Sequence, residues 1–394
     1  MAETKNMIVN MGPQHPATHG VLRVVLELDG EIVVKATPHL GHLHRGLEKL
    51  GETNTYHQAL TLTDRMDYTG ALLNNLGYCL TVEKLLGIED QIPPRAHVLR
   101  VCLCELQRIA GHLLWLASHA LDIGAMTVLF YAFRERETIH DILEEVTGAR
   151  LTPSFVRVGG LAADVPPVFF EKVRAFVKEF PGRVDEYEGL LTQNKIWRSR
   201  TEGIGIISKE ECVQYSLTGP VLRAAGIKWD LRKVQPYCGY DTYDFEVPTG
   251  TVGDVYERYL VRLAEMRQSI RIVSQALERL ASTPGPVMAD IACVTPPPKQ
   301  EVYENIDALI RHFKLMSAGF KTPEGDVYMS IEATKGELGY YIVSDGSEKP
   351  YRLRVRPPCF INLQSIEKMI VGRMVADVIA VIGSLDIVLG EIDR

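Results

Sequence analysis

The sequence predicts an α+β protein with a small N-terminal β-rich unit, a central helical bundle and a C-terminal α/β part. Two patterns lead to this fold class. Residues 7–36 alternate apolar and polar side chains as strands do, whereas residues 256–280 place apolar side chains at steps of three and four, as one face of a helix does. We place the three units at residues 1–50, 51–285 and 286–394.

The N-terminal unit contains three short apolar runs, at residues 7–9, 21–28 and 32–34. Asp29 and Gly30 separate the last two runs and are a strong signal for a hairpin turn. A loop rich in proline and histidine joins the first two runs. We therefore expect His15 and His19 to lie on a turn.

The central unit is predicted to be helical from about residue 46 to residue 150. Pro93 and Pro94 interrupt the pattern, and Arg95 opens a long helix that reaches about Ser118. Further helices are expected at residues 167–195 and 256–280, on either side of a loop-rich stretch. The sustained apolar stripe of the last helix indicates packing in a bundle.

The stretch Leu113–Phe133 is about long enough to cross a bilayer. His119 and Asp122 lie near its middle, and Gly124 interrupts it. An isolated charge at mid-membrane costs at least ~2.5 kcal/mol. We therefore expect this stretch to be helix buried inside protein.

The C-terminal unit is predicted to mix both kinds of element. We expect a strand, a helix near residues 300–317, a hairpin at 327–345 and a last helix near 365–382. The sequence Ser-Asp-Gly-Ser at residues 344–347 is the turn signal for the hairpin.

Composition describes an ordinary folded protein of several units, with 394 residues, 46% hydrophobic and 24% charged. The formal net charge is −7, so no overall basic field favours nucleic acid. Seven scattered cysteines without a C-x-x-C pair favour reduced thiols in a cytosolic compartment. Residues 1–10 contain no apolar signal-peptide core.

Histidines gather in two stretches, at residues 12–20 and 38–48, which hold five of the eleven. Such a density of imidazole rings indicates proton or redox chemistry. No cysteine lies near, and no pair has the spacing of a zinc site. A polar pocket for an organic redox partner therefore fits better than a metal centre.

Polar residues interrupt two apolar regions. In the first region, Leu60 to Leu73, we favour the interpretation that Arg65 forms an ion pair with Asp64 or Asp67 at the start of a helix. Asp122 needs a partner if it is buried, and a histidine would serve, although a helix-end cap is the alternative.

Arg223, Asp230 and Arg232 fit a structural ion-pair turn and a functional role equally well. Cys102 and Cys104 lie on an apolar helix and are expected in the core. No nucleotide-binding glycine motif and no G-x-S-x-G elbow occurs.

A set of motifs in order resembles one family, the D-type component of the peripheral arm of respiratory complex I, the proton-translocating NADH:quinone oxidoreductase. The motifs lie at residues 12–23 (GPQHPATHGVLR), 44–49 (HRGLEK), 64–68 (DRMDY), 93–96 (PPRA), 119–127 (HALDIGAMT), 194–201 (NKIWRSRT), 229–232 (WDLR), 350–358 (PYRLRVRPP) and 386–394 (DIVLGEIDR). The resemblance covers residues 7–394.

The resemblance implies the fold of the large subunit of nickel–iron hydrogenases, without the metal site. Hydrogenases hold their metals with two C-x-x-C pairs. The corresponding regions here are residues 65–70 and 386–391, and neither contains a cysteine. The resemblance implies that the cavity which holds the metals in hydrogenases is, in this family, a site for a quinone headgroup.

The resemblance also implies roles for single residues. Tyr68 donates to one quinone carbonyl, His19 donates to the other, and Asp122 orients and charges His19. The supporting residues of the quinone site and of its cluster-proximal side are His15, Arg45, Asp67 and Arg65.

Quinone is the implied substrate, and no cofactor is bound by the chain itself. Electrons come from an iron–sulfur cluster in an adjacent subunit, close to Arg45. Implied partners are complex I subunits of the B, C, I and H type, with membrane contact through partners at the cytoplasmic face of the bacterial inner membrane. Three alternatives stay open: a ferredoxin-driven sister complex, a hydrogenase-like subunit with its own metal, and a structural scaffold.

Overall fold

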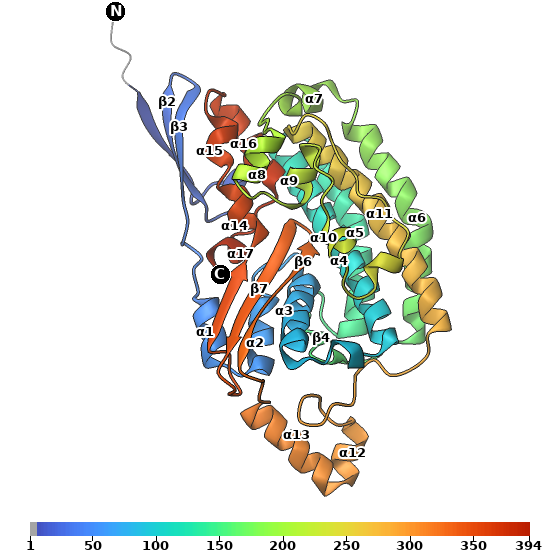
Figure 1. Ribbon diagram of the computed structural model, residues 1–394. Helices are drawn as coiled ribbons and strands as arrows, with labels where there is room; N and C mark the ends of the chain where they lie inside the picture. The colour runs from blue at the N-terminus through green and yellow to red at the C-terminus, as the bar shows by residue number, and fades with distance from the viewer. Residues whose placement is uncertain (1–5) are drawn as a thin grey trace, which may run out of the picture.

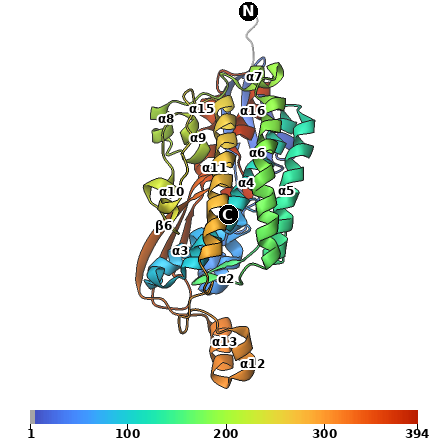
Figure 2. The same cartoon turned by 90° about the vertical axis from the view of Figure 1, so that its right-hand side faces the viewer.

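Long helices and two three-stranded antiparallel sheets dominate the computed structural model, which describes residues 6–394. The sheets lie along one side of the helices (Figure 1). Four of the helices run side by side along the long axis (Figure 2). These four are α4 (Pro94–Asp122), α5 (Met126–Thr147), α6 (Pro167–Leu191) and α11 (Val255–Ser282).

The boundaries of the long helices follow from local chemistry. Pro94 is the first helical residue of α4, where a missing N–H costs nothing. Gly124, at φ +101°, reverses the chain between α4 and α5. The stretch Leu113–Phe133, expected to be buried helix, is therefore divided between two helices, and three of its apolar side chains are exposed: Leu121, Met126 and Phe130. Asp254 caps α11 by accepting a hydrogen bond from the Glu257 N–H at 2.8 Å.

Strands β1 (Met7–Met11), β2 (Arg23–Asp29) and β3 (Ile32–His39) form the N-terminal sheet in that order. Asp29 pairs with Ile32, so the predicted hairpin is confirmed. The sheet lies beside the C-terminal helices α15 (Ile366–Ile370) and α16 (Val375–Leu385) (Figure 1), because Val33 exchanges backbone hydrogen bonds with residues 372–373.

The second three-stranded sheet packs against α3 (Ala71–Leu86) and consists of β6 (Gly325–Ala333), β7 (Gly336–Ser344) and β8 (Arg352–Arg356). The predicted hairpin turn at residues 344–347 is wrong for β6–β7, which turns at Thr334 and Lys335. Residues 344–347 lie in the connection from β7 to β8. Both turn residues are buried, so no run of exposed turn-forming residues marks this turn in the sequence.

The remaining helices are short, and the stretch predicted to be loop-rich contains four of them. The last predicted helix is two helices, α15 and α16, which a break at residues 371–374 separates. The remaining elements are α1 (Leu47–Thr53), α2 (Tyr56–Thr63), α7 (Lys195–Thr201), α8 (Lys209–Gln214), α9 (Gly219–Ala224), α10 (Leu231–Val234), α12 (Lys299–Glu304), α13 (Ile306–Ala318), α14 (Pro358–Leu363), α15 (Ile366–Ile370), α16 (Val375–Leu385), α17 (Leu389–Asp393), the strand pair β4 (Val156–Arg157) and β5 (Gly160–Leu161), and three single turns of 3-10 helix, η1 (Pro16–Thr18), η2 (Glu89–Gln91) and η3 (Tyr240–Thr242).

Two hydrophobic cores hold these elements together. The larger one lies among the long helices and the second sheet, and the smaller one lies between the N-terminal sheet and the C-terminal helices. Each core contains residues from all three segments proposed from the sequence, 1–50, 51–285 and 286–394, so these segments pack jointly. The division into three units stays a prediction.

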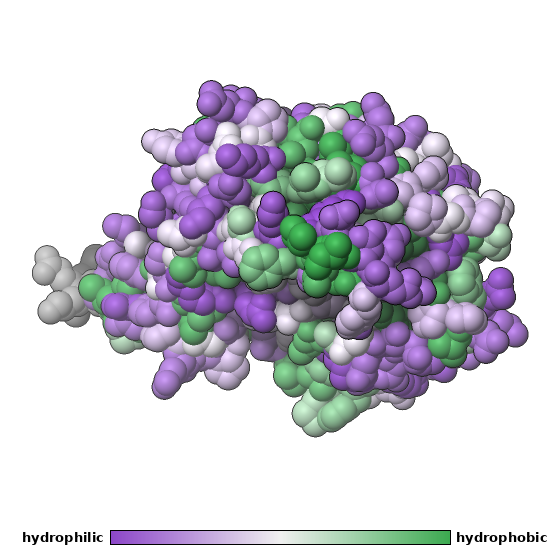
Figure 3. Space-filling view, turned by 90° about the horizontal axis from the view of Figure 1, so that it is seen from below, coloured by the Kyte–Doolittle hydropathy of each residue, from purple (hydrophilic) through white to green (hydrophobic). Residues whose placement is uncertain are grey.

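Helices α12 and α13 form a lobe that projects from one end of the molecule (Figures 1 and 2). The view onto that end shows apolar side chains among polar ones (Figure 3). The exposed apolar side chains of the lobe are Tyr303, Ile306, Leu309, Ile310, Phe313 and Met316. Nowhere in residues 6–394 is a helix both long enough and apolar enough to traverse a bilayer.

Candidate functional site

The loop between β1 and β2 is a folded turn that carries both histidines. His15 and His19 flank the short helix η1 (Pro16–Thr18), and the His15 Nδ1 accepts a hydrogen bond from the Ala17 N–H at 3.2 Å. The Thr18 hydroxyl donates to the His15 carbonyl oxygen at 2.8 Å and fixes the turn. The prediction that both histidines lie on a turn is confirmed.

His19 is half-buried and adopts left-handed backbone angles, with φ 52°. Burial and, to a smaller extent, the charge of Lys335 together lower the pKa of its imidazole to about 4. At pH 7 the ring is therefore neutral, and its buried Nε2 makes no hydrogen bond to residues 6–394.

Tyr68 lies in the segment after α2, and 46% of its surface is exposed. Burial of its inner part raises the pKa of the phenol, the charge of Asp67 raises it further, and Lys335 opposes both effects. The hydroxyl therefore keeps its proton at neutral pH and can donate a hydrogen bond.

Asp67, which precedes Tyr68 in the chain, forms a buried ion pair with Lys335. The Lys335 Nζ lies 3.1 Å from the Asp67 Oδ2 and also contacts the Thr69 hydroxyl. The other carboxylate oxygen of Asp67 accepts hydrogen bonds from the Thr69 hydroxyl at 2.6 Å and from the Thr69 N–H at 3.1 Å. The two charged side chains are almost completely buried, at 1–2% exposed.

Two further carboxyl groups come to this ion pair from the C-terminus. The Asp386 Oδ2 lies 3.9 Å from the Lys335 Nζ, and burial raises the pKa of Asp386 to about 6. Burial and the charge of Asp67 raise the pKa of Glu391 to about 7. The Cys359 N–H donates to Glu391 at 3.2 Å. We call Asp67, Lys335, Asp386 and Glu391 the ionic cluster.

Sequence reasoning missed Lys335, Asp386 and Glu391 as individual site residues. The acidic residues lie in the region that resembles the second hydrogenase motif, which was a usable signal. Lys335 gave no signal, because a lysine in a hairpin turn is ordinarily a solvated residue.

Arg65 pairs locally and lies outside the ionic cluster. Its Nη1 lies 3.1 Å from the Asp64 Oδ1, so the predicted local ion pair is confirmed, although it follows the end of α2 and starts no helix. Burial raises the pKa of Asp64 to about 6, and Arg65 opposes the rise. Asp67, the other candidate partner of Arg65, pairs with Lys335.

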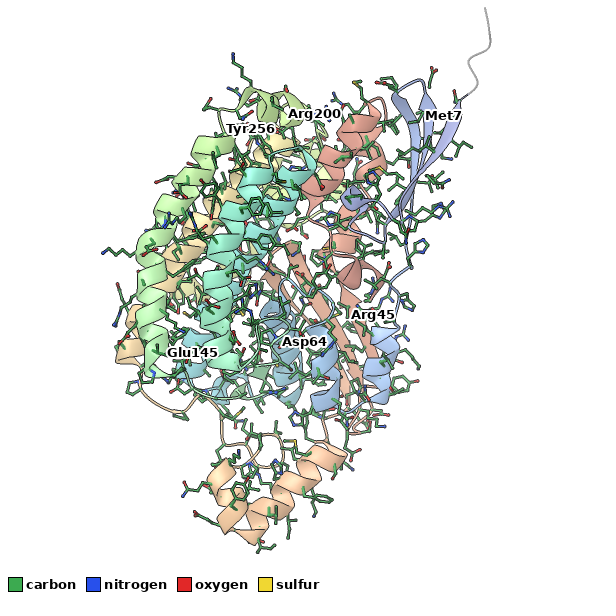
Figure 4. All side chains as sticks on the ribbon, turned by 180° about the vertical axis from the view of Figure 1, so that it is seen from behind. Met7, Arg45, Asp64, Glu145, Arg200 and Tyr256 are labelled. Carbon is green, nitrogen blue, oxygen red and sulfur yellow. The ribbon has the colours of Figure 1, made fainter. Side chains whose placement is uncertain are left out.

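Arg45 ties the N-terminal segment to both parts of the site. Its Nη2 donates to the Arg65 carbonyl oxygen at 3.2 Å and to the Gly390 carbonyl oxygen at 3.1 Å, and Figure 4 shows it near Asp64. The side chain is exposed at the surface of the molecule. Arg45 is therefore available to a neighbouring chain.

Asp122 is the last residue of α4, and it is half-buried. Burial raises the pKa of its carboxyl, and His15 opposes the rise. Within the described residues 6–394, no side chain donates a hydrogen bond to Asp122, so His19 does not contact it here in the way that the resemblance implies. His15 is the histidine that acts on Asp122.

A second ionic network lies deeper in the core. The Arg223 Nε and Nη1 lie 2.7 Å from carboxylate oxygens of Glu265 and Glu332, respectively. Arg232 pairs with Asp230 at 2.7 Å. All these side chains are at most 1% exposed, so the predicted ion pairs are present and buried.

The two cysteines of α4 are free thiols in the core of the protein. Cys102 and Cys104 are fully buried, and burial raises the pKa of the Cys102 thiol to about 12. Across residues 6–394, no three His, Cys, Asp or Glu side chains are arranged to hold a metal ion.

The fold and the site together define an α+β protein with a buried ionic cluster that the segment after α2, the β6–β7 turn and the C-terminus build jointly. Comparison with known proteins narrows this class. The family described as the respiratory-chain NADH dehydrogenase 49 kDa subunit matches residues 122–394.

Curated relatives match the whole chain. The D-type component of NADH-quinone oxidoreductase from Geotalea uraniireducens is 61% identical over 394 residues, which is 100% of both chains. The component of the same name from Geobacter sulfurreducens is 60% identical, again over 100% of both. One of the D-type components of a Roseiflexus species is 57% identical over 100% of this chain and 94% of its own. The chain belongs to the family of D-type components of NADH-quinone oxidoreductase.

Proposed function

We propose that this chain forms the quinone-reduction site of a proton-translocating NADH:quinone oxidoreductase. The observation that carries the proposal is the half-exposed Tyr68 side chain next to Asp67 of the buried ionic cluster, with His19 close enough for the charge of Lys335 to act on both residues. The names of the relatives support the same activity.

The two donors suit the chemistry of a quinone. Reduction adds two electrons and two protons, and negative charge develops on the two carbonyl oxygens. In the proposed arrangement Tyr68 donates to one carbonyl and His19 donates to the other. The raised pKa of Tyr68 and the neutral ring of His19 make both groups hydrogen-bond donors at pH 7.

Asp122 and the supporting residues keep the roles that the resemblance implies, as part of the proposal. Asp122 would act on the histidine loop, and Arg65 and Asp67 would shape the wall below Tyr68. Arg45 would lie near the iron–sulfur cluster of an adjacent subunit, where a cation favours arrival of an electron. Its exposed side chain and its contact with Gly390 support that position.

The exposed apolar side chains support membership of a larger assembly. Ile306, Ile310 and Phe313 present one apolar face of α13, and 67% of the Phe313 surface is exposed. A hollow of about 890 Å³ lies where this lobe meets the body of the protein. We propose that subunits of the B, C, I and H type cover such surfaces and hold the chain at the cytoplasmic face of the bacterial inner membrane.

The kinship with nickel–iron hydrogenases also belongs to the proposal. The segments that resemble the two hydrogenase motifs meet in the ionic cluster, through Asp67 on one side and through Asp386 and Glu391 on the other. Charged side chains would then stand where the ancestral protein held its metals. A stoichiometric content of nickel in the purified protein would contradict this view.

Tyr68→Phe in the assembled complex tests the function, because it removes one hydroxyl at little steric cost. Loss of one donor to a developing oxyanion lowers kcat by about 10²-fold. Tyr351→Phe is the matched control, since Tyr351 is 68% exposed and far along the chain. Unchanged NADH-driven quinone reduction by Tyr68→Phe would favour the scaffold alternative, and activity with reduced ferredoxin instead of NADH would favour the sister complex.

A further inference from the structure

We propose that Lys335 is a positioning residue of the quinone site, a fixed cation that stabilises the negative charge which the headgroup and Tyr68 acquire during reduction. This inference rests on the proposed function and deepens it. The charge of Lys335 acts on both proposed donors, Tyr68 and His19. A single cation that acts on two donors is suited to compensate charge on either of them.

The fold holds Lys335 in an unusual place. It lies in the two-residue turn between β6 and β7, yet it is 1% exposed, whereas lysines are almost never fully buried unless they are paired. The Asn362 side-chain amide donates to its carbonyl oxygen at 3.2 Å. Gly219 packs so closely that a Cβ there would lie 2.4 Å from that same oxygen. The backbone of Lys335 is therefore fixed from two sides.

The charges around Lys335 come from several elements. Carboxyl groups face it from the segment after α2 (Asp67), from the end of α16 (Asp386) and from α17 (Glu391). The Cys359 thiol on α14 also faces it, and Arg262 on α11 acts on Asp386 from the other side. Two carboxyl groups, Asp67 and Asp386, therefore lie within 4 Å of the one ammonium group, and the charge of Glu391 also acts on it.

This excess of carboxyl groups suggests that Lys335 does more than neutralise the charge of Asp67. A lysine needs one carboxylate partner, and Asp67 at 3.1 Å supplies it. The pKa values of Asp386 and Glu391, about 6 and about 7, allow these groups to be protonated near neutral pH. The pKa of Lys335 lies well above its ordinary value, mainly because the charges of Asp386 and Asp67 outweigh the effect of burial. Lys335 therefore keeps its proton, and its contribution is electrostatic.

The test uses the assembled complex with Lys335→Met, which keeps an unbranched side chain of similar length but removes the charge. This variant leaves Asp67 buried without a partner, so it can fail to fold. Lys335→Met combined with Asp67→Asn removes both charges of the pair. Lys84→Met is the matched control, because Lys84 is exposed and its Nζ contacts the same hairpin at the Tyr328 carbonyl oxygen, 3.4 Å away.

We expect the double variant to assemble, to bind quinone with little change in KM, and to show a kcat lower by about 10²-fold. The acid limb of its pH–rate profile is expected to move upward, because a positive charge next to His19 is gone. Lys84→Met is expected to match the wild type in both respects.

Wild-type kcat and an unshifted pH profile in the double variant would overturn the inference, since Lys335 would then only neutralise Asp67. That result leaves the proposed function intact as long as Tyr68→Phe is impaired. If the wild-type complex reduces no quinone with any donor, the proposed function itself fails.

Discussion

The charge of His15, on the histidine loop, acts on the carboxyl group of Asp122, the last residue of α4. Burial raises the pKa of the Asp122 carboxyl, and the His15 imidazole opposes that rise. The resemblance to the complex I family implies a different pair, in which Asp122 orients His19. Two histidines of one loop, His15 and His19, are therefore candidates for the partner of Asp122.

A double-mutant cycle distinguishes the two pairs. We expect Asp122→Asn and His15→Asn to be coupled by more than about 0.5 kcal/mol in kcat/KM for quinone reduction, and Asp122→Asn and His19→Gln to be additive within about 0.5 kcal/mol. Asn at position 15 keeps a side-chain acceptor for the Ala17 N–H, so the turn is preserved. The reverse pattern would show that Asp122 acts on His19 during turnover.

Arg100→Leu is expected to destabilise the protein by about 3–5 kcal/mol, because it leaves the Glu83 carboxylate buried without its cation. The Arg100 Nη1 lies 3.0 Å from one carboxylate oxygen of Glu83 and its Nη2 lies 2.5 Å from the other, with both side chains at most 1% exposed. Thermal or denaturant unfolding of the purified protein measures the loss.

Arg150→Leu is the control for that variant. Arg150 pairs with three acidic side chains, Glu137, Asp141 and Glu144, but its side chain is 40% exposed. Ion pairs that are exposed to water contribute little to stability, so the unfolding midpoint of Arg150→Leu should stay nearly unchanged. If Arg100→Leu and Arg150→Leu lowered the stability of the protein equally, burial would not be the reason why the Arg100–Glu83 pair matters.

His119→Phe is expected to make the protein less sensitive to acid. The His119 ring stacks on Trp115, with ring centroids 5.2 Å apart, and neither ring nitrogen has a hydrogen-bond partner within residues 6–394. Burial lowers its pKa to about 3, so the native state excludes a proton that the unfolded chain binds below about pH 6.5. Stability therefore falls as the pH drops from 6.5 towards 3.

The size of this effect follows from the two pKa values. At pH 5 the wild type should lose about 2 kcal/mol relative to its stability at pH 7.5 through this one group, whereas His119→Phe should not. His42→Phe serves as the control, because His42 is exposed in the folded protein. Unfolding midpoints at pH 7.5 and pH 5.0 that fall equally for wild type and His119→Phe would refute the assignment.

Much of the fold was predictable because its signals are local. The apolar stripe of α11, Pro94 at the start of α4 and the Asp29–Gly30 hairpin each act through residues a few positions apart. The β6–β7 turn was not predictable, because its two residues are buried by α9 and α14, which lie far away in the sequence.

The candidate site divides in the same way. Local sequence was enough to indicate the family of the chain, the placement of His15 and His19 on one turn and the presence of Tyr68 beside Asp67, because each of these depends on neighbouring residues. Long-range packing alone established that Lys335 pairs with Asp67, 268 residues away, and that the charge of His15 acts on Asp122. Such contacts depend on how buried charges find partners when distant segments pack, and no local pattern encodes that pairing.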